Sequence, residues 1–141
     1  MTRRLAGVAL VLALAVSACG GESAEEKAQK KVCSARADIK KQVDELKSTT
    51  ITTASVEGVQ SNLRAISKSL QAMVKAQKDL KGDRREAVQT ATQAFTTEVA
   101  NVGRQVITSL SAGDAEQQIR SAVEGLASSY AKALSPIDCS S

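Results

Sequence analysis

Three cysteines, Cys19, Cys33 and Cys139, are the residues of this chain whose chemistry is easiest to assign. A thiol can be acylated, can be oxidised to a disulfide, or can ligate a metal ion. Histidine, the usual general base near neutral pH, does not occur anywhere in the chain. The reactive side chains therefore favour covalent roles for the thiols over acid–base catalysis.

Cys19 follows a segment with the composition of an export signal. Arg3 and Arg4 form a basic head, and Leu5 to Val16 is a run of residues without charge. Such a head and run, followed by small residues, are typical of a secretory signal. The run is too short to span a bilayer, which requires about 20 apolar residues. We predict that residues 1–18 are a signal peptide.

The sequence Val16-Ser17-Ala18-Cys19 resembles the lipobox of bacterial lipoproteins, in which an aliphatic residue and two small residues precede an invariant cysteine. The family usually has leucine where this chain has Val16, and the resemblance covers only the leader and Cys19. It implies cleavage before Cys19 and a thioether-linked diacylglyceryl group on its sulfur, which would anchor the chain at the extracytoplasmic face of the cell membrane. A plain secreted protein with a chance cysteine is the alternative.

Cys33 and Cys139 remain as an even pair in an oxidising compartment, and we predict a disulfide between them. A closed loop of about 100 residues would restrict the unfolded chain by about 4.7 kcal/mol in the entropy model. Two free thiols are the alternative. No metal site is expected, because two cysteines without histidine supply too few soft ligands.

Other residues give weaker signals of catalysis. Ser129 and Lys132 match Ser-x-x-Lys, but nothing else indicates the β-lactamase fold in which this motif has meaning. Asp83, Glu86 and Asp114 lie at expected helix starts, where capping is the simpler role. The chain also lacks a Gly-rich phosphate loop. We therefore expect no enzymatic activity and no cofactor.

The charge balance does not indicate a nucleic-acid partner. Removal of residues 1–18 takes Arg3 and Arg4 from the 19 basic residues, which leaves 17 against 15 acidic ones. A balance of +2 is too small for nucleic-acid binding. One local cluster is predicted to be a solvated helix end, with a weak patch for an anionic partner as the alternative; it contains Lys75, Lys78, Lys81, Arg84 and Arg85.

Residues 19–31 are polar and are predicted to be a spacer between the lipid and the domain. Ser23 and Glu26 can form a capping box there, but a helix with little apolar surface to bury should fray. From Val32 the apolar residues recur at helical spacing. The predicted buried residues are Val32, Ala35, Ile39, Val43, Leu46, Val56, Val59, Leu63, Ile66, Leu70, Met73, Leu80, Val88, Ala91, Phe95, Val99, Val102, Val106, Leu110, Ile119, Ala122, Val123, Leu126, Tyr130, Ala133 and Leu134.

This spacing predicts four helices within residues 32–141. The first runs from 32 to 47. The second begins after Ser55, a favourable N-cap residue, and ends before Gly82. Gly82 suits the C′ position, which favours a left-handed residue. The third runs from Asp83 to about residue 110. The fourth is capped by Asp114 and ends before Pro136, because proline disfavours helix in the preceding residue.

Four amphipathic helices joined by short turns predict an all-α fold, an antiparallel up-down four-helix bundle. This topology brings the end of the fourth helix beside the start of the first, where Cys33 and Cys139 can meet. Both chain ends would face the membrane. The Thr-rich loop 48–54 and the turn 111–113 are expected at opposite ends of the bundle.

Gly58, Gly103 and Gly125 lie singly within the predicted helices, where each costs roughly 1 kcal/mol relative to alanine. Close contact between helices, or simple tolerance, is the first interpretation. The alternative is a narrow groove in which a partner approaches the backbone.

The predicted function is that of a membrane-anchored extracytoplasmic lipoprotein, a non-catalytic module that binds an envelope protein or a cell-wall component. The alternative is a carrier of small molecules or lipids with an apolar cavity between its helices. The lipobox, the Ala-rich helices and the positions of Cys33 and Cys139 are similar to those of small helical lipoproteins of actinobacteria. That group implies no particular activity.

Overall fold

A computed structural model describes residues 21–140 apart from Thr53, Ala54 and Ala112. The predicted signal peptide 1–18 and Cys19 lie outside the described residues. The described part is all-helical and contains no strand. Its elements are α1 (Ala24–Ser48), α2 (Val56–Ala76), the short 3-10 helix η2 (Gln77–Asp79), α3 (Gly82–Ser109) and α4 (Ala115–Ala133).

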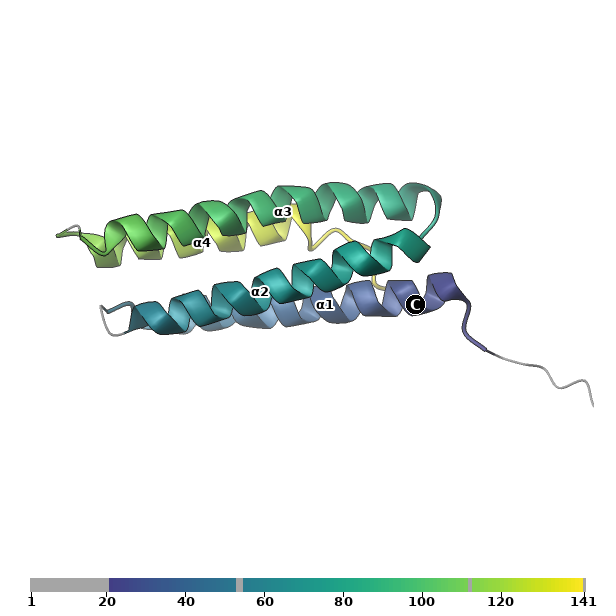
Figure 1. Cartoon of the computed structure of the whole chain (residues 1–141), viewed down its shortest axis with the longest axis horizontal. Helices are drawn as coiled ribbons and strands as arrows, with labels where there is room; N and C mark the ends of the chain where they lie inside the picture. The colour runs from purple at the N-terminus through teal and green to yellow at the C-terminus, as the bar shows by residue number, and fades with distance from the viewer. Residues whose placement is uncertain (1–20, 53–54, 112, 141) are drawn as a thin grey trace, which may run out of the picture.

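The four long helices form an antiparallel bundle, as predicted. α1 and α2 form one hairpin and α3 and α4 the other, and the two hairpins lie side by side as two layers (Figure 1). α1 also contacts α4, and α2 also contacts α3, which closes the ring of helices. Each helix thus has two neighbours around a shared interior, which is the arrangement of an up-down bundle.

The prediction that the loop 48–54 and the turn 111–113 lie at opposite ends of the bundle is wrong. The connection from α1 to α2 and the connection from α3 to α4 lie at the same end of the bundle (Figure 1). Each helix reverses the direction of the one before it, so alternate connections must share an end. We call this the distal end, and we call the other the disulfide end, where α1 begins and the segment after α4 returns to it.

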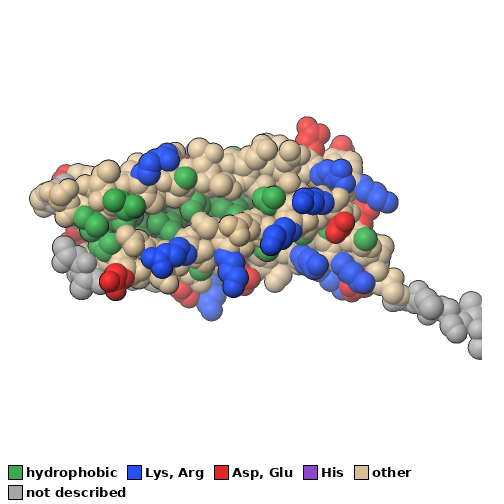
Figure 2. Space-filling view, viewed as in Figure 1, with side chains coloured by type: hydrophobic (Ala, Val, Ile, Leu, Met, Phe, Trp, Pro, Cys, Tyr) green, Lys and Arg blue, Asp and Glu red, His purple; other side chains and the backbone are tan. Residues whose placement is uncertain are grey.

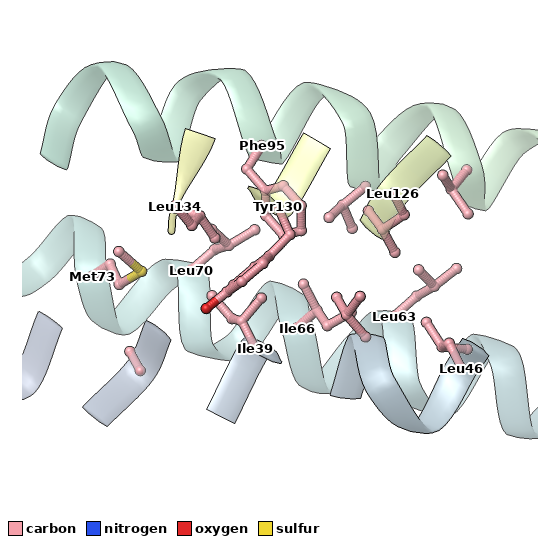
Figure 3. Close-up of a cluster of buried hydrophobic side chains, with 14 of the residues drawn as sticks. Ile39, Leu46, Leu63, Ile66, Leu70, Met73, Phe95, Leu126, Tyr130 and Leu134 are labelled. Carbon is pink, nitrogen blue, oxygen red and sulfur yellow. The ribbon is translucent and has the colours of Figure 1, made fainter. Parts of the chain in front are cut away.

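The core is built from one apolar face of each helix, and almost all of the predicted buried residues lie in it. Phe95, Ile39, Ile66 and Leu126 are fully buried and point toward the bundle axis (Figure 3). Burying such a side chain contributes about 1.5 to 3 kcal/mol. Leu110 is the clear exception, because it is 47% exposed where α3 ends.

α1 begins at Ala24 rather than at Val32, so the segment predicted to be a spacer is helical over its second half. The capping box forms, with Glu26 N donating to Ser23 Oγ at 3.1 Å and Ser23 N donating to Glu26 Oε2 at 2.9 Å. Ala28 is only 1% exposed and joins the core. These two extra turns of helix therefore bury apolar surface that the sequence pattern did not reveal.

Two of the predicted N-caps do not form. Ser55 and Asp114 occupy the N-cap positions of α2 and α4, but neither side chain bonds to a helix N–H. Neither residue has the extended backbone that such a cap needs, since ψ is −2° at Ser55 and 26° at Asp114. Ser55 Oγ instead bonds to the backbone of Thr52, and Asp114 Oδ1 accepts from Gln118 Nε2 at 2.7 Å.

The turn from η2 to α3 contains Gly82, whose φ of 51° is left-handed as predicted. Its predicted C′ position is wrong, because α2 ends at Ala76 and Gly82 is the first residue of α3. Because α3 starts at this glycine, Lys81 takes the N-cap position and no side chain caps the helix. The predicted cap by Asp83 and Glu86 is therefore wrong. Arg85 stabilises the turn instead, donating from Nε to the Leu80 carbonyl at 2.8 Å.

Candidate functional site

The predicted pairing of Cys33 and Cys139 is seen in the structure. Their Sγ atoms are 2.07 Å apart and their Cα atoms 5.6 Å apart, across a sequence separation of 106 residues. Cys33 lies in α1, and Cys139 lies in the segment that follows α4. The pair therefore joins the first helix of the bundle to the end of the chain.

Hydrogen bonds from α1 hold the same C-terminal segment in place. Arg36 Nη1 donates to the carbonyl of Ser135 at 3.1 Å and to that of Ile137 at 2.5 Å. Gln29 Nε2 donates to the carbonyl of Asp138. Sequence reasoning missed both donors, because a polar residue beside the apolar face of a helix shows no sign of its distant partner. We call Gln29, Arg36 and the Cys33–Cys139 pair the tail clasp.

Tyr130 lies beside the tail clasp at the edge of the core. Its ring meets Phe95 edge to face, with 6.1 Å between centroids, and its hydroxyl donates to the Arg36 carbonyl at 3.4 Å (Figure 3). Burial raises the pKa of the Tyr130 phenol above its usual 10.0, although the charge of Arg36 opposes this shift. The tail clasp is thus a structural closure of the bundle, although Gln29, Ile137 and Asp138 also line a small hollow of about 330 Å³ beside it.

An apolar groove runs along the seam between α2 and α3, on the face shown in Figure 2. Its volume is about 580 Å³. The buried side chains of Leu63, Leu70 and Val99 line it beside smaller side chains. We call it the α2–α3 groove; its lining residues are Leu63, Arg64, Ser67, Leu70, Gln71, Val74, Lys75, Thr96, Val99, Ala100 and Gly103.

Gly103 lies at an open position of this seam. A Cβ added at Gly103 would meet nothing within 4 Å, so this glycine is not needed for close packing of helices. The interpretation as a close contact is wrong at Gly103, whereas simple tolerance and the alternative of a groove both agree with this open position. Val74 at 41% and Ile107 at 62% are, with Leu110, the large apolar side chains most exposed among the described residues. Ile107 follows Gly103 by one helical turn on the same side of α3.

Cations border this groove. Arg64 and Lys75 are among its lining residues, and Arg104 is the next residue after Gly103. Among the described residues that line the groove, none is acidic. Several Lys and Arg side chains lie along the α2 side of this face (Figure 2). An apolar floor with a rim of one charge sign attracts ligands of the opposite sign.

A second groove lies between α3 and α4, and acidic residues outnumber basic ones in its lining. It measures about 900 Å³, and its alanine-rich lining includes Asp83, Glu86 and Glu98. Ser129 and Lys132 also line it. No hydrogen bond joins these two in the described part of the chain, so Ser129 lacks the adjacent base that would activate a nucleophile.

Two residues of the basic cluster at the α2–α3 turn make contacts that stabilise the fold. Arg85 Nη2 donates to the carbonyl of Lys78 at 2.6 Å, in addition to its bond to Leu80. Arg84 Nη1 lies 4.0 Å from Glu25 Oε1 in α1. Two of the five cations are therefore engaged with neighbouring elements, and the prediction of a merely solvated helix end is incomplete.

The described residues contain neither a cluster of metal ligands nor a helix suited to span a membrane. Over residues 21–140, omitting 53, 54 and 112, no three His, Cys, Asp or Glu residues lie close enough to hold a metal ion. In the same ranges, no helix combines the length and apolar character needed to cross a membrane.

The chain was compared with models of protein families, with curated proteins and with solved structures, and none of the three comparisons gave a match.

Proposed function

We propose that this chain is a non-catalytic binding module, held by a lipid on Cys19 at the extracytoplasmic face of a bacterial cell membrane. There it would bind an envelope protein or a cell-wall component. The leader and its resemblance to a lipobox support the anchor. The absence of histidine supports a role in binding rather than in proton transfer.

The observation that carries the proposal is the α2–α3 groove. Most large apolar side chains of the four helices are buried in the core, yet Val74 and Ile107 stay exposed along this one seam. Exposed apolar side chains grouped beside an apolar groove and rimmed by polar residues are typical of interaction sites.

The arrangement of the ends is compatible with an anchored module. Cys19 precedes the N-cap Ser23 by four residues, a stretch that spans at most about 14 Å when extended. The lipid would therefore lie near the disulfide end. The α2–α3 groove extends away from that end as far as Leu63 and Gly103, where the attachment would leave it accessible.

A carrier of small amphiphiles is the second candidate. A volume of about 580 Å³ falls within the range of roughly 300 to 1,000 Å³ that ligand pockets occupy. The groove is open along its length, so a carrier of this design would shield only one side of its ligand.

Crosslinking within the native membrane tests the proposed module. A photoreactive residue placed at Val74 in the full chain should crosslink to one recurrent partner, and Gly103→Leu should abolish that product. The same residue at Ala37, exposed on α1 away from the groove, serves as the control. Equal products from both positions would contradict a binding surface along α2 and α3.

A further inference from the structure

We propose that the α2–α3 groove binds the acyl chain of a single-chain anionic amphiphile, such as a long-chain fatty acid, with its carboxylate at the cationic rim. This inference rests on the second candidate function, a carrier of small amphiphiles, because it names the ligand class of that carrier's groove. It follows from three features of the groove: its floor, its walls and the sign of its rim.

The floor and walls suit a polymethylene chain. Leu63, Leu70 and Val99 offer aliphatic surface, while Ala100 and Gly103 keep one wall free of bulky side chains. A thin chain can lie along such a slot and contact both helices. Each methylene group that leaves water in this way tightens binding about fourfold, which makes affinity depend on chain length.

The rim selects the sign of the head group. Arg64 and Lys75 can donate charge-assisted hydrogen bonds to a carboxylate. The α3–α4 groove is larger, but its three carboxylates, those of Asp83, Glu86 and Glu98, outnumber its one cation, Lys132. An anionic amphiphile would be repelled there, so charge rather than volume assigns it to the α2–α3 groove.

The same features disfavour two other occupants. In a two-fold dimer through this groove, the cations Arg64 and Lys75 of one copy would face the same two cations of the other, and like charges repel. A stable protein interface also buries more than about 1,000 Å² in total, whereas the exposed large apolar side chains here are Val74, Ile107 and Leu110.

The test uses the chain from residue 19 onward with Cys19→Ser, which retains the closed ring of helices from 24 to 133. Palmitate is titrated below its micelle concentration and followed by amide NMR. We expect saturable binding, with the largest shifts at Val74, Thr96 and Gly103. A hexadecylammonium cation should bind at least about tenfold more weakly, and added salt should reduce this difference.

Matched glycine variants localise the site. Gly103→Leu fills the groove and should weaken palmitate binding at least about tenfold, equivalent to two methylene groups excluded. Gly58→Leu introduces the same side chain in α2, where a Cβ also meets nothing within 4 Å, and should leave binding unchanged. Gly125→Leu, which lies in the α3–α4 groove, should also leave it unchanged.

Charge variants test the head group. Arg64→Gln combined with Lys75→Gln should weaken palmitate binding about fivefold, as expected for exposed ion pairs, and should leave the binding of hexadecanol unchanged.

Several results would overturn the inference. These are the absence of saturable palmitate binding, equal affinity in the Gly103→Leu and Gly58→Leu variants, or shifts centred on Ala87 and Gly125. Binding of an acidic amphipathic peptide in place of palmitate, or concentration-dependent dimerisation through Ile107, would also do so. None of these results depends on the lipid at Cys19, so failure of this inference and failure of the anchor can be distinguished.

Discussion

Arg36 in α1 donates a hydrogen bond of 2.5 Å to the carbonyl of Ile137, which lies 101 residues later in the chain. The same nitrogen also reaches Ser135, and the Cys33–Cys139 pair lies beside it. The α1–α4 seam is thus closed by a covalent link and by a charged donor. The other seam between the two hairpins, that of α2 and α3, contains the apolar groove. One side of the ring is therefore fixed, and the other has room for a ligand.

Replacement of Arg36 tests the tail clasp. Arg36→Ala should lower the free energy of unfolding by about 1.5 to 3 kcal/mol, because two carbonyls lose a charged donor. Urea unfolding followed by circular dichroism, with the disulfide intact, measures this loss. Lys41→Ala, at an exposed position of the same helix, should change stability by no more than about 0.5 kcal/mol. Equal effects of the two substitutions would show that the clasp contributes nothing.

Reduction of the Cys33–Cys139 pair should destabilise the bundle while leaving it helical. Opening a loop that spans 106 residues frees the unfolded chain, at a cost in folding stability of up to about 4.7 kcal/mol. Thermal unfolding with and without a reductant gives the difference. The double variant Cys33→Ser/Cys139→Ser should match the reduced protein and should not respond to the reductant. A melting temperature that is insensitive to the reductant would contradict this prediction.

Phe95 should be the most costly single truncation in the core. It is fully buried and packs against Tyr130, so Phe95→Ala should destabilise the bundle by about 3 to 5 kcal/mol through the cavity that it leaves. Ile107→Ala removes an aliphatic side chain that is 62% exposed, and should cost less than about 0.5 kcal/mol. Chemical denaturation of both variants makes the comparison. A small effect at Phe95 would mean that the ring is not central to packing.

Asp138 provides a pH-dependent reporter of the tail. The Ser140 hydroxyl and backbone N–H both donate to Asp138 Oδ1, which holds the pKa of that carboxyl below its ordinary value of 3.8. The folded state favours the charged form, so this contribution to stability is complete above pH 3.8 and is lost as the pH falls through the lower pKa. NMR titration of the carboxyl carbon should show the lowered pKa. Ser140→Ala should raise it, and Ser128→Ala should not; titration at or above 3.8 in the parent chain would contradict the assignment.

The helical spacing of apolar residues was sufficient to predict the fold. Positions such as Ile39, Ile66 and Val102 recur every three or four residues and are buried as predicted. Gly82 marked its turn because a left-handed residue there favours glycine. The start of α1 was misplaced because Ala28 alone carries the apolar signal of its first turns, and alanine is equally common on exposed faces.

The candidate site was predictable only in part. Cys33 and Cys139 were identified because pairing of two thiols needs no knowledge of geometry beyond which ends of the bundle meet. Gly103 raised the possibility of a groove, but nothing local to the sequence distinguished it from Gly58. The hydrogen bonds of Arg36 and Gln29 join distant segments to backbone carbonyls, which every residue possesses. Such contacts become visible only when the tail is placed against α1.

The mass of the intact protein purified from membranes of producing cells tests the proposed anchor most directly. The account predicts a chain that begins at Cys19 and carries the added mass of a diacylglyceryl group on that residue. Cys19→Ser should lose both the added mass and the membrane association. A membrane-free protein with an unmodified Cys19, or one that retains residues 1–18, would contradict the proposal that a lipid fixes this bundle to the membrane.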